Sequence, residues 1–240
     1  MANVPIDKVS EGPTSNASEF TWKGAHALRR VYALNDRCLE LLVQLARTER
    51  TRLNLAIVNQ HRSLWRSLSA SARRRAALTP YLLVDVHFQD VDWWRWAKAP
   101  RAGGRRGVIS QPAFSGKVAA ELMRETLMLA WSTVVLDRGT AGVLLGMTPG
   151  VSEIIAALGP QDVERTIARH NRHLRPRWED FPAFWGRLLE AAQKGDEEAL
   201  LEVRLYGLQL IGSELLPRLD GRLMSPLPQH LTDIAAHRDR

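Results

Sequence analysis

One short stretch of this chain alternates apolar and polar side chains like a β-strand, whereas the segments around it have helical periodicity. The stretch is YLLVDVHF, residues 81–88, and Pro80 directly before it opposes continuation of a preceding helix. An isolated strand cannot keep its backbone N–H and C=O groups unpaired in a core. The fold must therefore supply something with which this strand pairs.

Helical patterns dominate the rest of the chain. Apolar residues recur every three or four positions over 28–46, which predicts an amphipathic helix. A short helix with Leu64, Trp65 and Leu68 follows, and a third helix is predicted over 69–78, with Ser69 able to cap it. Thr148 followed by Pro149 is typical of a helix start, and an acidic turn at Asp196 begins a C-terminal helix.

The second half of the chain repeats the order of the first half. A shift of 90 residues, without a gap, aligns Leu68 with Leu158, Arg75 with Arg165, Val84 with Leu174, Phe88 with Trp178 and Asp90 with Asp180. This duplication offers the lone strand a partner in its counterpart around 172–178. Pro176 removes one ladder donor, so that counterpart is expected to be short or to lie at an edge.

The predicted fold is mainly α, with two helical repeats that each carry one short β-strand and form an intrachain pseudo-dimer. We expect a disordered leader over 1–22, a first repeat over 23–98 and a Gly/Pro/Arg linker over 99–116. A second repeat over 117–194 and a C-terminal helix and tail over 195–240 complete this prediction.

The formal net charge of +7 favours an acidic partner, such as nucleic acid or an anionic membrane surface. Of the 33 basic residues 28 are Arg, which a GC-rich genome would also produce. The N-terminus lacks a secretory apolar segment, and no window approaches the roughly 18 apolar residues of a membrane span, so the cytoplasm is expected. One cysteine, Cys38, excludes an internal disulfide and a multi-cysteine zinc site.

Arginines form the candidate DNA-binding set, because guanidinium groups suit phosphate contacts. The candidates are Arg73, Arg74 and Arg75 on a helix, Arg101, Arg105 and Arg106 in the linker, and Arg165, Arg169, Arg172, Arg175 and Arg177 in the second repeat. A solvated helix face and a soluble tether are the alternatives for the first two groups. Residues 141–158 also fit a helix-turn-helix, although Ser152 and Glu153 are poor base readers, so a packed helical pair is favoured.

Aromatic and aliphatic side chains form a second candidate set, at the interface between the repeats or with a partner. It comprises Val84, Val86, Phe88, Trp93, Trp94, Trp96, Leu174, Trp178, Phe184 and Trp185. Base stacking is the alternative for the tryptophans. His170 and His173 near Asp180 suggest a metal at first, but no third ligand has matching spacing, so surface histidines are the ordinary explanation and no metal or cofactor is expected.

The first repeat resembles the D subunit of the bacterial flagellar master transcriptional activator, the FlhD family. The resemblance runs through VYALNDRCLELLVQLA, LWRSLSASARRRAAL and LLVDVHF, and the second repeat carries it in 143–178, from VLLGMTPGVSEIIAAL to HLRPRW. It implies a helical, dimerising subunit that joins a zinc-containing C subunit to activate promoters. Family members hold one copy of the pattern, whereas this chain holds two. A cysteine near the dimer strand of some members falls on Val84 and near Arg175, so no cross-strand disulfide is expected.

Searches for nucleophile elbows, P-loops, dinucleotide fingerprints and HExxH find none, so we do not expect an enzyme. The leading prediction is a DNA-associated transcriptional activator subunit that works with a zinc-containing FlhC-like partner, controlling flagellar or mobile-element transfer genes. The alternative is a non-enzymatic scaffold or adaptor of a secretion or conjugation machine. Neutralising the linker arginines distinguishes the activator subunit from the adaptor, because the change would weaken binding to DNA and leave a protein scaffold intact.

Overall fold

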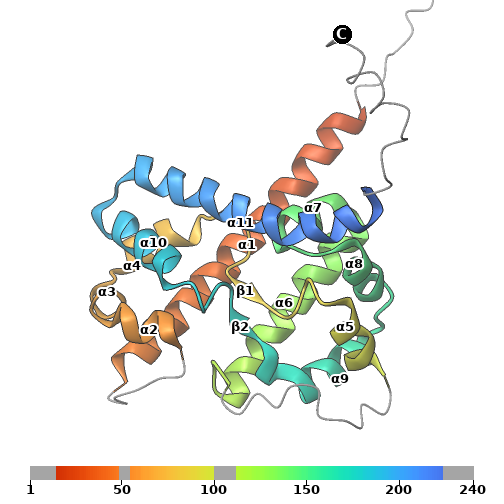
Figure 1. Cartoon of the computed structure of the whole chain (residues 1–240), viewed down its shortest axis with the longest axis horizontal. Helices are drawn as coiled ribbons and strands as arrows, with labels where there is room; N and C mark the ends of the chain where they lie inside the picture. Colours follow the sequence, from red (N-terminus) through yellow and green to blue (C-terminus); the bar gives the residue numbers. More distant parts are fainter. Residues whose placement is uncertain (1–14, 49–54, 100–111, 224–240) are drawn as a thin grey trace, which may run out of the picture.

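The architecture is mainly α-helical with one two-stranded sheet, as a computed structural model of the chain shows (Figure 1). The structure describes residues 15–48, 55–99 and 112–223, and the side chains of 24–48, 55–99 and 112–216. The predicted mainly α class is therefore confirmed. The linker arginines Arg101, Arg105 and Arg106 lie outside the described residues.

The first half contains five helices and one strand among its described residues: α1 (Ser15–Arg47), α2 (Ala56–Gln60), α3 (Arg62–Ser67), α4 (Ala70–Ala77), β1 (Val84–Asp85) and α5 (Val91–Lys98). Helix α1 begins at Ser15, inside the segment predicted to be a leader. The Ser69 hydroxyl accepts the N–H of Ala72 at 3.1 Å, so the predicted cap of α4 is confirmed.

The second half has the same order: α6 (Gly116–Leu136), α7 (Arg138–Leu145), α8 (Pro149–Ala156), α9 (Pro160–His170), the 3₁₀ turn η1 (Asn171–His173), β2 (Arg175–Pro176) and α10 (Pro182–Lys194). Helix α11 (Glu197–Leu223) follows. Thr148 stands at the N-cap of α8 with Pro149 at its first position, as predicted. Asp196 caps α11 by accepting the N–H of Ala199 at 3.0 Å.

The two strands pair antiparallel, with Val84 opposite Pro176 and Asp85 opposite Arg175. Pairing between these two segments was predicted, but a strand over the whole of 81–88 was wrong. Asn35 on α1 takes up the neighbouring backbone groups, since its amide donates to the Tyr81 carbonyl at 2.8 Å and its oxygen accepts the Leu83 N–H at 2.8 Å. The strand therefore shrinks to two residues, because a side chain replaces the ladder before it.

The turn after β1 limits the strand on its other side. Asp85 accepts the backbone N–H groups of His87 and Phe88 at 3.0 and 3.3 Å, which bends the chain in an Asx-type turn. His87 has a φ of 50° there, in the left-handed region that few residues other than glycine adopt. The alternation of apolar and polar residues in the sequence indicates that one face of the segment is buried, but it does not predict this turn.

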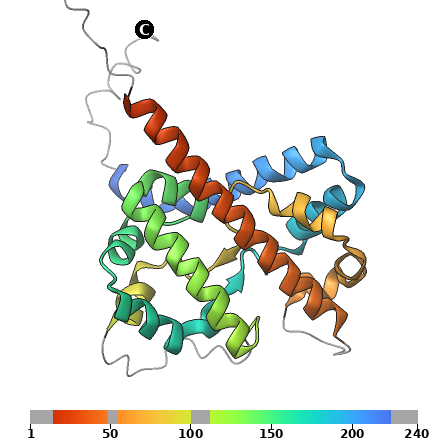
Figure 2. The same cartoon turned by 180° about the vertical axis from the view of Figure 1, so that it is seen from behind.

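Each helix that follows a strand packs on the opposite half of the chain. Helix α5 contacts α8 and α9, whereas α10 contacts α2, α3 and α4. Gly150 and Gly186 permit these approaches: an added Cβ would lie 2.9 Å from Val91 at the first and 2.7 Å from His61 at the second. Helices α1 and α6 lie side by side across the back of the molecule (Figure 2). The halves are thus interlocked and share one core.

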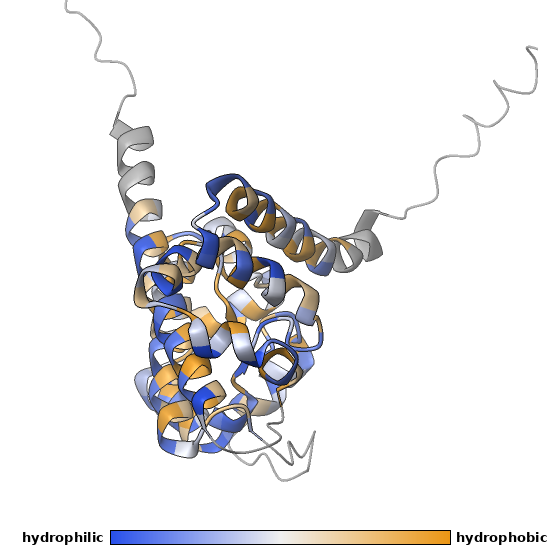
Figure 3. Ribbon diagram, turned by 90° about the vertical axis from the view of Figure 1, so that its left-hand side faces the viewer, coloured by the Kyte–Doolittle hydropathy of each residue, from blue (hydrophilic) through white to orange (hydrophobic). Residues whose placement is uncertain are grey.

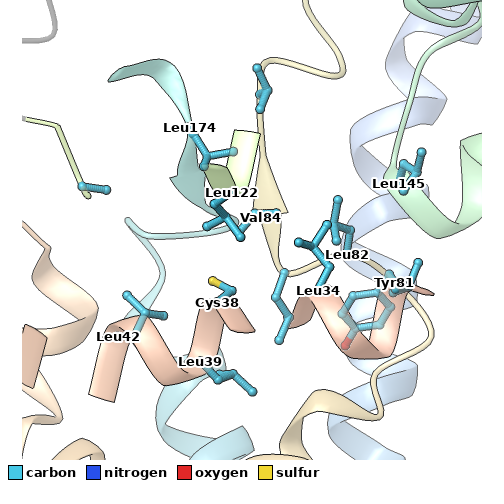
Figure 4. Packing of buried hydrophobic residues seen from close by; sticks show 14 of the residues in the cluster. Leu34, Cys38, Leu39, Leu42, Tyr81, Leu82, Val84, Leu122, Leu145 and Leu174 are labelled. Atoms are coloured by element: carbon cyan, nitrogen blue, oxygen red, sulfur yellow. The ribbon is translucent and has the colours of Figure 1, made fainter. Parts of the chain in front are cut away.

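The core surrounds the strand pair. Val84 and Leu174 from the strand segments lie with Cys38 of α1 and Leu122 of α6, and all four are at most 1% exposed (Figure 4). Burial raises the pKa of the Cys38 thiol far above its ordinary range. Each fully buried leucine contributes about 1.5–3 kcal/mol to the free energy of unfolding.

Helix α11 crosses over the junction between the halves (Figure 1). The Tyr81 hydroxyl donates to the Val203 carbonyl at 3.3 Å, and the Trp178 indole donates to Glu214 at 2.6 Å. Gln89 donates to the same carboxylate. Because these contacts come from both halves, α11 stabilises their arrangement.

Candidate functional site

Three arginines follow one face of α9 and the turn after it. Arg165, Arg169 and Arg172 are spaced by four and three residues, so they project from the same side of the helix. The opposite side is held in the core by Val163 and Ile167, which fixes the outward direction of the arginines. We name these three residues the α9 basic face.

The α9 basic face is accessible to a large ligand. Arg169 and Arg172 are exposed, while Arg165 is half-buried and pairs with Asp162 at 2.8 Å. Asp162 also accepts the Gly159 N–H at 3.2 Å, which anchors the first turn of α9. A partly exposed ion pair between neighbouring turns is weak, so Arg165 can exchange its partner for a phosphate.

Lys98 extends the positive charge to the beginning of α9. Its ammonium donates to the carbonyl of Ala157, just before α9, at 3.5 Å. The sequence did not single out Lys98, because nothing in its local pattern shows that α5 packs against α9. Arg124 and Glu164 lie nearby as an exposed pair at 2.7 Å, which adds no net charge.

Of the two remaining candidate arginines, Arg175 is half-buried and Arg177 is buried. Arg175, in β2, pairs with Glu179 in the turn that follows the strand. Arg177 is 3% exposed, its guanidinium donates to the Leu145 carbonyl, and it lies 3.6 Å from Asp85. Its prediction as a DNA contact is wrong, because the carbonyl and the carboxylate bind it in the core. Burying an arginine without such partners would be very costly.

The three consecutive arginines of α4 divide between two roles. Arg73 makes a bidentate pair with Asp36, at 2.8 and 3.3 Å, and this hydrogen bond raises the pKa of the guanidinium. Arg75 donates twice to the Ala192 carbonyl near the end of α10, at 2.9 and 2.7 Å. Only Arg74 of the three is classed as exposed. Arg73 and Arg75 therefore join helices together.

Helices α7 and α8 meet through Gly146, whose φ of 61° allows the sharp turn. The two helix axes are bent by 115°. Ser152, a candidate base reader, is 1% exposed, and Glu153 pairs with Arg138 at 3.9 Å. Helices α7 and α8 are therefore packed against each other in the body of the protein, as the favoured prediction had it. Helix α8 offers neither Ser152 nor Glu153 as a free side chain for reading DNA bases.

Histidines from both halves meet in an aromatic cluster with two tryptophans. His87 Nε2 lies 3.1 Å from His173 Nδ1, and the rings of His87 and Trp93 stack at 4.6 Å. Trp96 contacts His170, with ring centroids 4.9 Å apart. The prediction of surface histidines was wrong for His170, which is 5% exposed. Only the tertiary structure brings His87 to this place.

Burial keeps these histidines neutral near physiological pH. Removal from water lowers the pKa of His87 and of His170, and Arg169 lowers that of His170 further. The pKa of His173 falls to about 4, through burial first and then through its histidine neighbours. Among the described residues, no group of three or more His, Cys, Asp or Glu side chains could hold a metal ion.

The predicted interface residues are concentrated at the junction of the halves. Trp94 donates its indole N–H to the His87 carbonyl at 3.1 Å, and Trp185 donates to the Arg177 carbonyl at 3.0 Å. The set is buried except for two half-buried members; the buried ones are Val84, Val86, Phe88, Trp93, Trp94, Leu174, Phe184 and Trp185, and the half-buried ones are Trp96 and Trp178. Burial removes Trp93, Trp94 and Trp185 from base stacking.

No single helix in the described ranges is long and apolar enough to cross a membrane, although α7 and α8 together pass that test as a sharply bent pair. Comparison of the chain with protein-family models, curated proteins and solved structures found no match.

Proposed function

We propose that this chain is a DNA-associated subunit of a transcriptional activator complex, built from two FlhD-like repeats that fold as an intrachain pseudo-dimer. DNA association is carried by one observation, the α9 basic face, on which Arg165, Arg169 and Arg172 share one side of a helix. Backbone phosphates are the ligands that such a row suits, because guanidinium groups bind them without reading sequence.

The duplication is supported by the last elements of each half, which are separated by a nearly constant number of residues. Helix α4 begins 90 residues before α9, and α5 begins 91 residues before α10. The two non-glycine residues with positive φ, His87 at 50° and Trp178 at 51°, are also 91 positions apart among the described residues. One extra residue therefore enters the second repeat before its strand, where the sequence alone suggested a gap-free shift.

The pseudo-dimer is supported by exchange between the halves. The two short strands pair antiparallel, and the helix after each strand packs on the other half. Such reciprocal contacts are what two copies of one subunit make about a two-fold axis. The fused chain would present the surface of a dimer at any concentration.

A zinc-containing C-like partner subunit belongs to this proposal, as the resemblance implies. The described surface has an apolar row for a protein contact: Met128, Trp131 and Val135 on α6 are 45%, 37% and 56% exposed. Their spacing of three and four residues places them on one side of the helix. In the alternative, an adaptor of a secretion or conjugation machine, the same row would bind a protein and the charge would serve solubility.

Binding of the full chain to a labelled DNA duplex, measured against salt concentration, tests the proposal. We expect weak binding by the chain alone, with a Kd of about 10⁻⁴ to 10⁻⁶ M, that weakens steeply as salt rises. The slope of the logarithm of the binding constant against the logarithm of the salt concentration is negative. The double variant Arg169→Gln with Arg172→Gln should make this slope shallower by about two.

The control removes equal charge elsewhere. Arg29 and Arg66 are exposed on α1 and α3, and their double change to Gln should reduce binding less. Equal losses in both double variants would mean that the α9 basic face is not the contact. Absence of binding at low salt would refute DNA association by the chain and favour the adaptor.

A further inference from the structure

Helix α11 is apolar on two sides. Its inner side packs on the protein through Leu200, Val203 and Ile211, which are 0%, 6% and 3% exposed. Apolar and polar residues alternate along α11 (Figure 3). Its outer side carries Leu201 and Leu205, which are 54% and 52% exposed. A helix that only covered a core would have a polar outer side.

The outer side follows the spacing of a coiled-coil seam. Leu201, Leu205, Leu208, Gly212 and Leu215 are separated by four, three, four and three residues. Leu201 and Leu205 are exposed, whereas Leu208 and Leu215 are half-buried and also pack against the core of their own chain. Alternation of three and four is the pattern that places side chains along the contact between two paired helices. Gly212 is open, since an added Cβ there would meet no atom within 4 Å.

Charge distinguishes the orientations in which a second copy of the helix could pair with it. The first turns of α11 hold Glu197, Glu198 and Glu202, all exposed. In a parallel pair Glu197 of one copy would face Glu202 of the other, which is repulsive. In an antiparallel pair Glu202 of one copy faces Gln209 of the other, which is uncharged, and the helix dipoles oppose each other favourably.

The side chains of the seam also fit its own antiparallel copy. If the antiparallel helices cross midway between residues 205 and 208, Leu205 lies against Leu208 of the second copy and Leu201 lies against its Gly212. The missing side chain at Gly212 leaves room for the leucine that approaches it. Large and small residues thus alternate across the contact, which is how close-packed interfaces are filled.

We propose that two copies of this chain associate through the outer seam of α11, with the helices antiparallel. The seam lies outside both repeats, so this contact is independent of the pairing of β1 with β2 and of DNA binding. The exposed Leu201 and Leu205, the half-buried Leu208 and the open Gly212 then form the centre of a symmetric interface.

Sedimentation of the full chain tests this contact. The wild type should dimerise at concentrations of tens of micromolar, and Leu205→Arg should weaken dimerisation at least about tenfold. Leu205 is half-exposed, so the change leaves the core intact, and an unaltered circular dichroism spectrum would show this. Val143→Arg is the matched control, because Val143 is 54% exposed and lies on α7 rather than on α11.

Two results would overturn the proposal. One is a wild type that stays monomeric at about 100 µM. The other is a Leu205→Arg variant that dimerises as strongly as the Val143→Arg variant.

A cysteine experiment tests the orientation. In the antiparallel pair two copies of residue 205 are offset by three residues, about 4.5 Å along the axis, whereas two copies of residue 201 are offset by about 16 Å. A short thiol cross-linker should therefore join Leu205→Cys dimers and not Leu201→Cys dimers. Cys38 is fully buried and serves as the unreactive background. Equal cross-linking of both variants would indicate a parallel pair and contradict the proposed geometry.

Discussion

Replacement of Gly207 by Ala should destabilise the protein, although alanine favours helices more than glycine does. Gly207 lies in α11 directly over Tyr81, and an added Cβ would be 1.9 Å from the Tyr81 hydroxyl oxygen and 2.2 Å from Cζ. Tyr81 is fully buried, so its ring has no free space to enter. The substitution must therefore displace either the ring or the helix.

The expected magnitude follows from three contributions. Overpacking costs about 1–3 kcal/mol, and loss of the hydrogen bond from Tyr81 to the Val203 carbonyl costs about 1 kcal/mol. Helix propensity returns about 1 kcal/mol. The free energy of unfolding should fall by about 1–3 kcal/mol, which lowers Tm by roughly 2–12 °C for a chain of this size.

Gly212→Ala is the matched control on the same helix. No atom would lie within 4 Å of the new Cβ, so only helix propensity acts and Tm should rise by a few degrees. Both substitutions should be made in the Leu205→Arg background, which keeps the seam of α11 unpaired. Urea unfolding and thermal melting followed by circular dichroism measure the difference.

A double-mutant cycle separates the clash from other effects. Tyr81→Leu removes the ring, so Gly207→Ala should cost less in that background than in the wild type, with a coupling energy of about 1 kcal/mol or more. If Gly207→Ala is as stable as Gly212→Ala, the close approach of α11 to Tyr81 is wrong, and so is the inferred role of α11 in holding the two halves.

The remaining predictions concern the buried charges and the histidines. Arg177→Ala should lower the free energy of unfolding by about 3–5 kcal/mol, because Asp85 and Glu214 lose their buried cation. Arg175→Ala, which breaks a partly exposed pair with Glu179, should cost about 1 kcal/mol or less in the same urea experiment; equal costs would contradict the burial of Arg177. The folded-state pKa of His173 is about 4, below the ordinary 6.5, so the unfolded chain binds more protons between these values. Stability should therefore be retained above pH 6.5 and fall as the pH drops from 6.5 towards 4. His173→Asn should reduce that fall, and a fall of unchanged size would show that His173 does not contribute to it.

Local patterns predicted helix boundaries well where the causes are local. Ser69 caps α4 and Pro149 occupies the first position of α8, and both act within a few residues of their own position, so the sequence contains all that decides them. The pairing of the two strand segments was also predictable, since a lone strand needs a partner and the duplicated order offers one. The predictions failed where a distant residue competes for the same backbone groups.

Asn35 is the clearest example of such competition. Asn35 lies on α1, far in sequence from residues 79–83. Its side chain nevertheless forms hydrogen bonds with backbone groups of Tyr81 and Leu83, which the strand pattern had predicted to bond to a neighbouring strand. No period or turn signal marks it. A buried asparagine is revealed only when the elements around it are placed.

The sequence by itself determined the helical class, the repeated order of elements and the positive charge, because periodicity, capping residues and composition act locally or add over the whole chain. Only the tertiary structure decided which arginines reach solvent. Arg169 and Arg177 look alike in the sequence, but one lies on the outer side of α9 and the other is 3% exposed beside Asp85. The same holds for the histidine and tryptophan cluster and for the outer seam of α11. Burial depends on what packs against a residue from far along the chain, and that is a property of the fold.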